Sequence, residues 1–218
     1  FELAGFKCIY GSEIDRFSRE TYKAFFGEYP DNDDITVLTK GKKSIESTIP
    51  AHSILTAGFP CQPFSLAGVS KKNSMQKPHG FQDITSGTMF FHIKKIIQVK
   101  KPDIIFLENV KNLQSHNGKK TYSTIMDSLA KPMKNLEYIV ADKVIDASKW
   151  VPQHRERIFF VCLKKKKNIK KEINSDFIKE KIFPENPSTD KRDLSEILDD
   201  NCSAKYTLRD GTWNALKK

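Results

Sequence analysis

The chain has 218 residues, and its 37 lysine and arginine residues outnumber its 27 aspartate and glutamate residues, which gives a formal net charge of +10 at pH 7. A hydrophobic content of 38% with 15 phenylalanines excludes wholesale disorder, because disordered chains lack the apolar residues that build a core. No apolar run approaches the ~18 residues of a membrane span, so no membrane partner is predicted. The positive charge suits a polyanionic partner.

The four cysteines are far apart in the sequence and form no C-x-x-C pair: Cys8, Cys61, Cys162 and Cys202. Neither a disulfide framework nor a metal site is therefore expected, and reduced thiols indicate a cytoplasmic protein. No basic-then-apolar leader is visible, which agrees with that location. Because the chain opens at Phe1 in the middle of a pattern, we expect it to be a fragment of a longer protein.

The first part of the chain alternates between strand-like and helical patterns. Residues 7–14 are rich in β-branched and aromatic side chains, which predicts a strand. A helix should follow over residues 15–27, with an aspartate cap at its start and a glycine at its end. Residues 52–57 predict a second strand, and the polar residues 61–87 predict a long functional loop. One face of the predicted helix carries Phe17, Thr21 and Phe25.

The second part continues the alternation. Apolar residues recur at helical spacing over 89–100, and the near-continuous apolar run 103–107 predicts a strand buried on both faces of a parallel sheet. A further helix is expected at about 120–131, strands at 138–145 and 157–163, and a short helical segment at 194–198. The order of elements predicts an α/β fold with a doubly wound, mostly parallel sheet.

Polar residues follow three of the predicted strands, where ligands bind in open α/β sheets. Glu13 closes the first strand, Pro60-Cys61-Gln62-Pro63 follows the second, and Glu108-Asn109-Val110 follows the buried one. Cys61 stands among turn formers, which suits an exposed thiolate nucleophile, although a lone cysteine is more often a small buried residue. Cys8 and Cys162 lie in apolar strands, so we expect both to be buried.

Three motifs occur in one order along the chain: Gly58-Phe59-Pro60-Cys61-Gln62-Pro63-Phe64-Ser65, then Glu108-Asn109-Val110, then Gln153-His154-Arg155-Glu156-Arg157. Together they resemble the cytosine-5 DNA methyltransferases, and the resemblance covers about residues 1–165. It implies the α/β fold of the S-adenosylmethionine-dependent methyltransferases. The family setting that it favours most simply is a bacterial restriction–modification system, with double-stranded DNA as the partner.

The resemblance implies a reaction that these residue types can perform. Cys61 would add to C6 of a cytosine flipped out of the duplex, so that C5 becomes nucleophilic enough to take a methyl group. Glu108 would hold or donate a proton at ring N3, which drains the charge that builds up during the attack. Arg157 would bind ring O2, and Arg155 would support the geometry of its loop.

The resemblance also implies S-adenosylmethionine as the methyl donor. An acidic residue at the end of the first strand, Glu13, would hold the ribose hydroxyls, and Asp34 would bind the adenine amino group. The residues that the resemblance assigns to this cofactor are Glu13, Ile14, Asp34, Ile35, Pro60 and Met89.

The same comparison predicts how the chain is organised. Residues 1–165 would form the catalytic domain, and 166–218 would lead toward a target-recognition domain beyond Lys218. The family's glycine-rich cofactor loop is expected upstream of Phe1. Within the loop after the second strand, DNA contacts are expected from Gln62, Ser65, Lys71 and Lys72.

Several alternatives remain open from the sequence. An RNA cytosine-5 methyltransferase of the same fold shares the cysteine and glutamate motifs. A split enzyme would need a second subunit for target recognition, and an inactive homologue would bind DNA without modifying it. An unrelated basic α/β protein is the remaining alternative. The lysine-rich run 164–171 either contacts DNA phosphates or forms a solvated loop.

Overall fold

A computed structural model describes residues 2–31, 34–60, 89–166, 172–185, 193–198 and 209–216. The chain divides into two compact units. The first contains Phe1–Ile145 and Glu156–Pro184, and the second contains Asp146–Arg155 and Glu185–Lys218. Within the described ranges, no helix has the length and apolar character needed to cross a bilayer.

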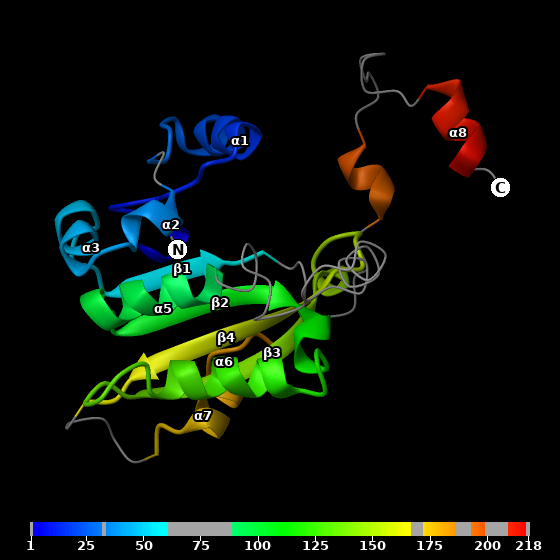
Figure 1. The fold of residues 1–218 in the computed structure, drawn as a ribbon. Coiled ribbons are helices and arrows are strands. Elements are labelled where there is room, and N and C mark those ends of the chain that lie inside the picture. Colours follow the sequence, from blue (N-terminus) through cyan, green and yellow to red (C-terminus); the bar gives the residue numbers. More distant parts are fainter. Residues whose placement is uncertain are drawn as a thin grey trace. The chain divides into compact units, whose positions relative to one another are not determined.

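The described strands form a four-stranded sheet in the order β1-β2-β4-β3, as Figure 1 shows. The strands are β1 (Ile54–Gly58), β2 (Ile104–Val110), β3 (Tyr138–Asp146) and β4 (Glu156–Lys164). β1 runs parallel to β2, whereas β4 runs antiparallel to β2. The α/β class is confirmed, but the described sheet is mixed rather than mostly parallel. The segment 147–155 between β3 and β4 is too short for the crossover that a parallel neighbour requires.

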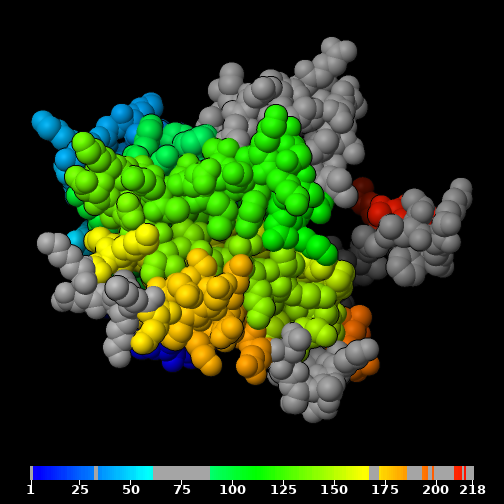
Figure 2. Space-filling view, turned by 90° about the horizontal axis from the view of Figure 1, so that it is seen from below, coloured from blue at the N-terminus to red at the C-terminus, as the bar shows by residue number. Residues whose placement is uncertain are grey.

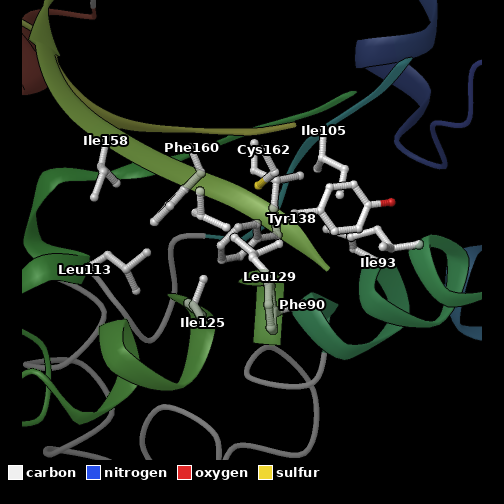
Figure 3. Close-up of a cluster of buried hydrophobic side chains, with 14 of the residues drawn as sticks. Phe90, Ile93, Ile105, Leu113, Ile125, Leu129, Tyr138, Ile158, Phe160 and Cys162 are labelled. Atoms are coloured by element: carbon white, nitrogen blue, oxygen red, sulfur yellow. The ribbon is translucent and has the colours of Figure 1, made fainter. Parts of the chain in front are cut away.

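Helices cover both faces of this sheet, as a doubly wound fold requires. On one face, α5 (Met89–Lys100) and α6 (Lys120–Ala130) pack against β2, β3 and β4. Figure 3 shows the side chains of β4 meeting those of both helices in this core. On the other face, α7 (Ser175–Lys181) places Ile178 against Ala141 and Val161, and Figure 2 shows α7 in orange at the surface of this unit.

The alternation of side chains along β2 explains how one strand serves both faces. Ile105 and Leu107 are fully buried beneath α5 and α6, while Phe106 points to the opposite face and contacts Phe159 of β4 at a ring distance of 5.6 Å. The prediction of a strand buried on both faces is therefore only partly right. The face toward α7 is half-buried, because α7 is a short helix.

The helix predicted over residues 15–27 is present as α1 (Arg16–Phe26). Asp15 caps it by accepting a hydrogen bond from the Ser18 N–H, and Gly27 ends it in the left-handed region at φ 81°. The expected apolar face, however, is exposed: Phe17 and Phe25 retain 76% and 80% of their accessible surface. No residue of α1 is buried against the described part of the chain.

The prediction of a strand over residues 7–14 is wrong. The described backbone there pairs only at an isolated bridge between Ser12 and Asp31, and this single bridge does not make a ladder. Apolar side chains remain half-exposed there, with Ile9 at 48%. Cys8, expected to be buried, is exposed for the same reason, whereas Cys162 is fully buried as expected. Burial raises the pKa of the Cys162 thiol.

Short elements complete both units. In the first unit they are η1 (Glu2–Ala4), α2 (Ile35–Leu38), α3 (Lys42–Thr48) and η3 (Lys111–Gln114). Leu38 and Ile45 of α2 and α3 pack with Ile96 of α5 in a smaller core cluster. The second unit contains η4 (Ala147–Lys149), η5 (Leu194–Ile197) and α8 (Asp210–Leu216). The helical segment expected at 194–198 is thus a single 3-10 turn.

Candidate active site

Two of the predicted catalytic side chains meet at the carboxyl end of β2. Glu108 Oε1 and Arg157 Nε lie 2.8 Å apart and form an ion pair. The register of the sheet brings them together, because Val110 of β2 pairs with Arg157 of antiparallel β4. Both side chains are partly exposed, at 35% and 22%, so this carboxylate and guanidinium are within reach of a ligand.

The end of β1 is fixed against the same edge. Gly58 pairs with Glu108 across the parallel ladder, and the next residue, Phe59, is buried and packs on Phe90 at a ring distance of 5.7 Å. The Asn109 side chain, also buried, donates from Nδ2 to the Phe59 carbonyl at 3.4 Å and accepts the Val110 N–H at 2.8 Å. Asn109 therefore ties the segment that leads to the cysteine motif to the strand that carries Glu108.

Within the cysteine motif, Pro60 and Cys61 follow this anchor directly in the sequence. Pro60 is exposed at the end of the described segment. The residues predicted to act as nucleophile and as DNA contacts lie outside the described residues: Cys61, Gln62, Ser65, Lys71 and Lys72. Their roles stay predictions.

Replacing Asn109 with alanine should loosen this edge. The buried Phe59 carbonyl and Val110 N–H would lose a partner, and leaving buried polar groups unpaired costs about 1–3 kcal/mol. We expect the free energy of unfolding to fall by that amount in a urea titration of Asn109→Ala. A matched change at an exposed helical position, Asn214→Ala in α8, should cost less than Asn109→Ala. Equal losses from the two variants would contradict the anchoring role of Asn109.

A second ion pair lies beside the first. Lys111 Nζ, just after β2, and Glu156 Oε1, at the start of β4, are 2.6 Å apart. Glu108 near the end of β2 thus meets Arg157 of β4, and Lys111 directly after β2 meets Glu156 of β4. A one-residue slip in the pairing would break both contacts, so the two pairs favour the observed register.

Arg155, the fourth predicted catalytic residue, belongs to the second unit. Its side chain is exposed, and its backbone N–H donates to Asp146 Oδ1 at 3.0 Å. The same carboxylate accepts hydrogen bonds from Ser148 and pairs with the His154 ring at 2.7 Å. The Ser148 N–H and hydroxyl, followed by Arg155 and His154, hold the pKa of Asp146 well below its ordinary value. Asp146 thus organises the turn that carries Arg155.

The predicted ribose-binding residue, Glu13, lies between the Ser12 bridge and α1. Its carboxylate accepts the Asp15 N–H at 2.8 Å, and its backbone N–H donates to the Asp31 carbonyl at 3.1 Å. The neighbouring Ile14 is 60% exposed. The bond joins Glu13 to Asp31, which precedes Asp34 by three positions in the sequence.

Asp34, the predicted adenine-binding residue, is the N-cap of α2. Its Oδ1 accepts both the Thr36 N–H at 2.8 Å and the Thr36 hydroxyl at 2.7 Å. These bonds hold the pKa of Asp34 below its ordinary value, so the carboxylate stays ionised at neutral pH. Ile35 and Met89, from α2 and α5, pack against the same core cluster. The structure therefore brings these predicted cofactor contacts toward one region.

One further contact joins α2 to α5. The hydroxyl of Thr39, which is only 2% exposed, hydrogen-bonds to His92 Nδ1. Lys95 Nζ donates to the Thr39 carbonyl at 3.3 Å from the same helix. Burial and then the charge of Lys95 lower the pKa of His92, against an opposing effect of Asp34.

This contact predicts a pH dependence of stability. Because the pKa of His92 is lowered in the folded chain from its ordinary 6.5, the unfolded chain takes up the proton first as pH falls. The free energy of unfolding should therefore decrease below about pH 6.5, whereas above it the imidazole is neutral in both states. Melting temperatures measured from about pH 8 to pH 5 should fall more steeply for wild type than for His92→Asn. Parallel profiles would contradict this prediction.

The described part of the lysine run lies at the opposite end of β4 from Arg157. Lys166 pairs with Asp103 at 2.9 Å, and Lys165 pairs with Glu137 at 3.2 Å. The lysines hold the pKa values of Asp103 and Glu137 below their ordinary values. Because Asp103 precedes β2, this cluster lies at the amino end of the strand whose carboxyl end carries Glu108. These lysines are paired with carboxylates and lie at the end of the sheet away from Glu108. Both facts favour a structural role for them over contact with DNA phosphates.

Sequence reasoning did not assign a role to several residues that shape the site. Asn109 lies inside the Glu108-Asn109-Val110 motif. It occupies a position that the alternation of β2 places on the buried face, and a polar amide at such a position could have predicted a buried hydrogen bond. Lys111 directly follows the second motif and Glu156 lies within the third, and the two residues form an ion pair. His92 gave no signal, because it is a single histidine in an apolar helix and its partner is far away in the sequence.

Comparison with known proteins identifies the family of this chain. The family model of the C-5 cytosine-specific DNA methylases matches residues 1–218. A DNA-cytosine methyltransferase of Escherichia coli K12 is 40% identical over 241 residues, which cover 99% of this chain and 49% of that protein. The type II methyltransferase M.HhaI of Haemophilus parahaemolyticus is 38% identical over 205 residues, covering 88% of this chain and 56% of that protein. The chain thus spans about half the length of these curated relatives.

Solved structures show the same fold. The Dnmt2 methyltransferase of S. pombe matches with a TM-score of 0.63 and 15% identity, over 99% of this chain and 60% of that one. The Entamoeba histolytica methyltransferase EhMeth matches with a TM-score of 0.56 and 17% identity, over 92% and 54% of the two chains. At these identities the likeness concerns the fold alone.

Proposed function

Because this chain belongs to the C-5 cytosine-specific DNA methylase family, we propose that the protein transfers a methyl group to C5 of cytosine in double-stranded DNA. The observation that supports this most is the edge of the sheet where β1 and β2 end. There the Glu108–Arg157 pair lies beside the Phe59 anchor, and Cys61 follows Phe59 by two residues in the sequence.

The chemistry assigns one task to each of these residues. The Cys61 thiolate adds to C6 of an extruded cytosine, and the electron pair that this releases makes C5 the nucleophile. Glu108 holds a proton at ring N3 while negative charge develops on the ring. Arg157, held in place by Glu108 and by its bond to the Glu156 carbonyl at 2.8 Å, presents its guanidinium to ring O2. Once C5 carries the methyl group, its proton leaves to water. The electron pair of that C–H bond restores the C5=C6 double bond and expels Cys61 as a thiolate.

The family requires a methyl donor, and we propose S-adenosylmethionine. A sulfonium cofactor supplies an electrophilic methyl group for the activated C5 when it is bound. The described residues fit such a molecule: an ionised Asp34 can accept from an adenine amino group, and the Glu13 carboxylate can accept from ribose hydroxyls. Ile14, Ile35 and Met89 supply apolar surface near these carboxylates.

The remaining assignments are proposals of the same kind. The net charge of +10 suits duplex DNA, and the segment 61–88 would contribute Gln62, Ser65, Lys71 and Lys72 to its contacts. Residues 1–165 would be the catalytic domain of a longer restriction–modification enzyme in the cytoplasm. A second subunit for target recognition stays an alternative to recognition by the same chain.

The test uses the full-length protein that contains this chain and S-adenosylmethionine with a labelled methyl group. The substrates are a cytosine-rich DNA duplex, an RNA of the same sequence, and the same duplex with every cytosine already methylated at C5. We expect label in the unmodified duplex only. Label in the RNA alone would move the protein to RNA methylation with the same chemistry. Equal label in the two duplexes would show that C5 of cytosine is not the acceptor.

A further inference from the structure

The residues proposed to surround the adenine come from two separate elements. Asp34 and Ile35 lie at the start of α2, and Met89 opens α5. α2 has four residues, a length at which a helix has no stability of its own. Its position, and with it the position of Asp34, must therefore be set by contacts with neighbouring elements.

The Thr39–His92 contact is placed to do this. Thr39 follows Ile35 by one helical turn, and its hydroxyl donates to the Ile35 carbonyl at 2.8 Å. His92 follows Met89 by one turn on α5. Since the single hydroxyl proton of Thr39 goes to Ile35, His92 Nδ1 carries a hydrogen and donates it to Thr39. The imidazole thus connects Thr39, one turn after Ile35, with α5 at a position one turn after Met89.

We propose that His92 is a positioning residue for the adenine side of the cofactor site, acting through Thr39 on the turn that carries Asp34 and Ile35. The inference rests on the proposed function. Without the imidazole, the buried Thr39 hydroxyl loses a partner and α2 loses a tie to α5. The cofactor would then have to order this turn when it binds, which weakens affinity and leaves the methyl-transfer step itself unchanged.

The test measures S-adenosylmethionine affinity by calorimetry and steady-state kinetics in the full-length protein. His92→Leu and Thr39→Val should each raise Kd about three- to tenfold, the effect of one lost hydrogen bond, while kcat at saturating cofactor stays within about twofold. The double variant should be no weaker than either single one, because both changes remove the same contact. His92→Asn, whose amide can donate from the position of Nδ1, should restore affinity. Lys94→Met is the matched control on α5, because Lys94 contacts Ser128 of α6 instead.

The outcomes separate this inference from the proposed function. Normal affinity in both His92→Leu and Thr39→Val would overturn the positioning role alone. An equal loss in Lys94→Met, or failure of His92→Asn to restore affinity, would also overturn it, because the effect would then reflect general loosening of α5. If the wild-type protein binds no S-adenosylmethionine, the proposed function fails and the inference fails with it.

Discussion

Glu108→Gln should lower kcat for methyl transfer by a factor of about 10² to 10⁴, the range that a positioned proton donor contributes. Glutamine keeps the size of the side chain and can still hydrogen-bond, but it cannot hold the proton that the ring needs at N3. Removing the ion pair with Arg157 should cost no more than about 1 kcal/mol of folding stability, because both partners are partly exposed. Single-turnover methyl transfer and urea unfolding therefore have to be measured on the same preparation.

The matched control for this change is Glu137→Gln. Glu137 is also half-exposed and also ion-paired, to Lys165, but it lies away from the carboxyl end of β2. We expect methyl transfer by this variant to stay within about twofold of wild type. If both glutamine variants lose activity together, or if Glu108→Gln transfers methyl groups at the wild-type rate, Glu108 is not the proton donor.

Phe160→Ala should be among the most destabilising single changes in the described chain. Phe160 is fully buried in the larger core cluster, where Figure 3 shows it among other apolar side chains. Its ring lies 6.3 Å from the Tyr122 ring of α6. Truncating a buried phenylalanine costs about 3–5 kcal/mol, because transfer energy is lost and a cavity remains. Folded domains are stable by only about 5–15 kcal/mol, so the midpoint of urea unfolding should fall sharply.

Phe17→Ala provides the comparison within the same residue type. Phe17 lies on α1 and is 76% exposed, so its truncation removes little buried surface. We expect its free energy of unfolding to stay within about 0.5 kcal/mol of wild type. A loss at Phe17 as large as that at Phe160 would mean that α1 packs against another part of the full-length protein.

Elements with strong periodicity could be predicted from the sequence. The helix over residues 89–100 has the predicted bounds, because its phenylalanines and isoleucines repeat at 3.6-residue spacing and Pro102 prevents its continuation. The strands that begin near Ile104 and Glu156 were found for a similar reason, since their apolar runs are short and end at polar residues. Periodicity was sufficient to predict an element where the residues that it marks as one apolar face are the residues buried in the core.

Other features depend on contacts that local patterns do not encode. The sheet is mixed because β4 follows β3 after a short connection, a consequence of connectivity rather than of propensity. Residues 7–14 have strand composition, but within the described part of the chain their backbone forms a single bridge, between Ser12 and Asp31. Helix α7 was not predicted, because it lies in a stretch rich in lysine that lacks a clear apolar periodicity. Its start is nevertheless marked by Asn174, whose side chain caps the helix by accepting the Phe177 N–H.

The candidate site, like the fold, could be predicted from the sequence only in part. The three motifs predicted that Glu108 and Arg157 belong together, and the pairing of β2 with β4 confirms that they are neighbours. The anchor between Asn109 and Phe59 joins residues from two strands that are separated by α5, so only the folded sheet reveals it. The catalytic roles of all four residues stay predictions: Cys61, Glu108, Arg155 and Arg157.

The central claim is that Cys61 is the nucleophile that attacks cytosine, and one comparison tests it directly. Labelled methyl transfer to duplex DNA is measured with the full-length wild type, Cys61→Ser and Cys8→Ser. Cys8 is the control because it is a free, exposed cysteine that the mechanism does not use. Loss of transfer by a factor of at least about 10³ in Cys61→Ser, with Cys8→Ser near wild type, is the expected result, because a serine hydroxyl is hardly ionised and adds poorly to C6. Transfer by Cys61→Ser at the wild-type rate would contradict the account.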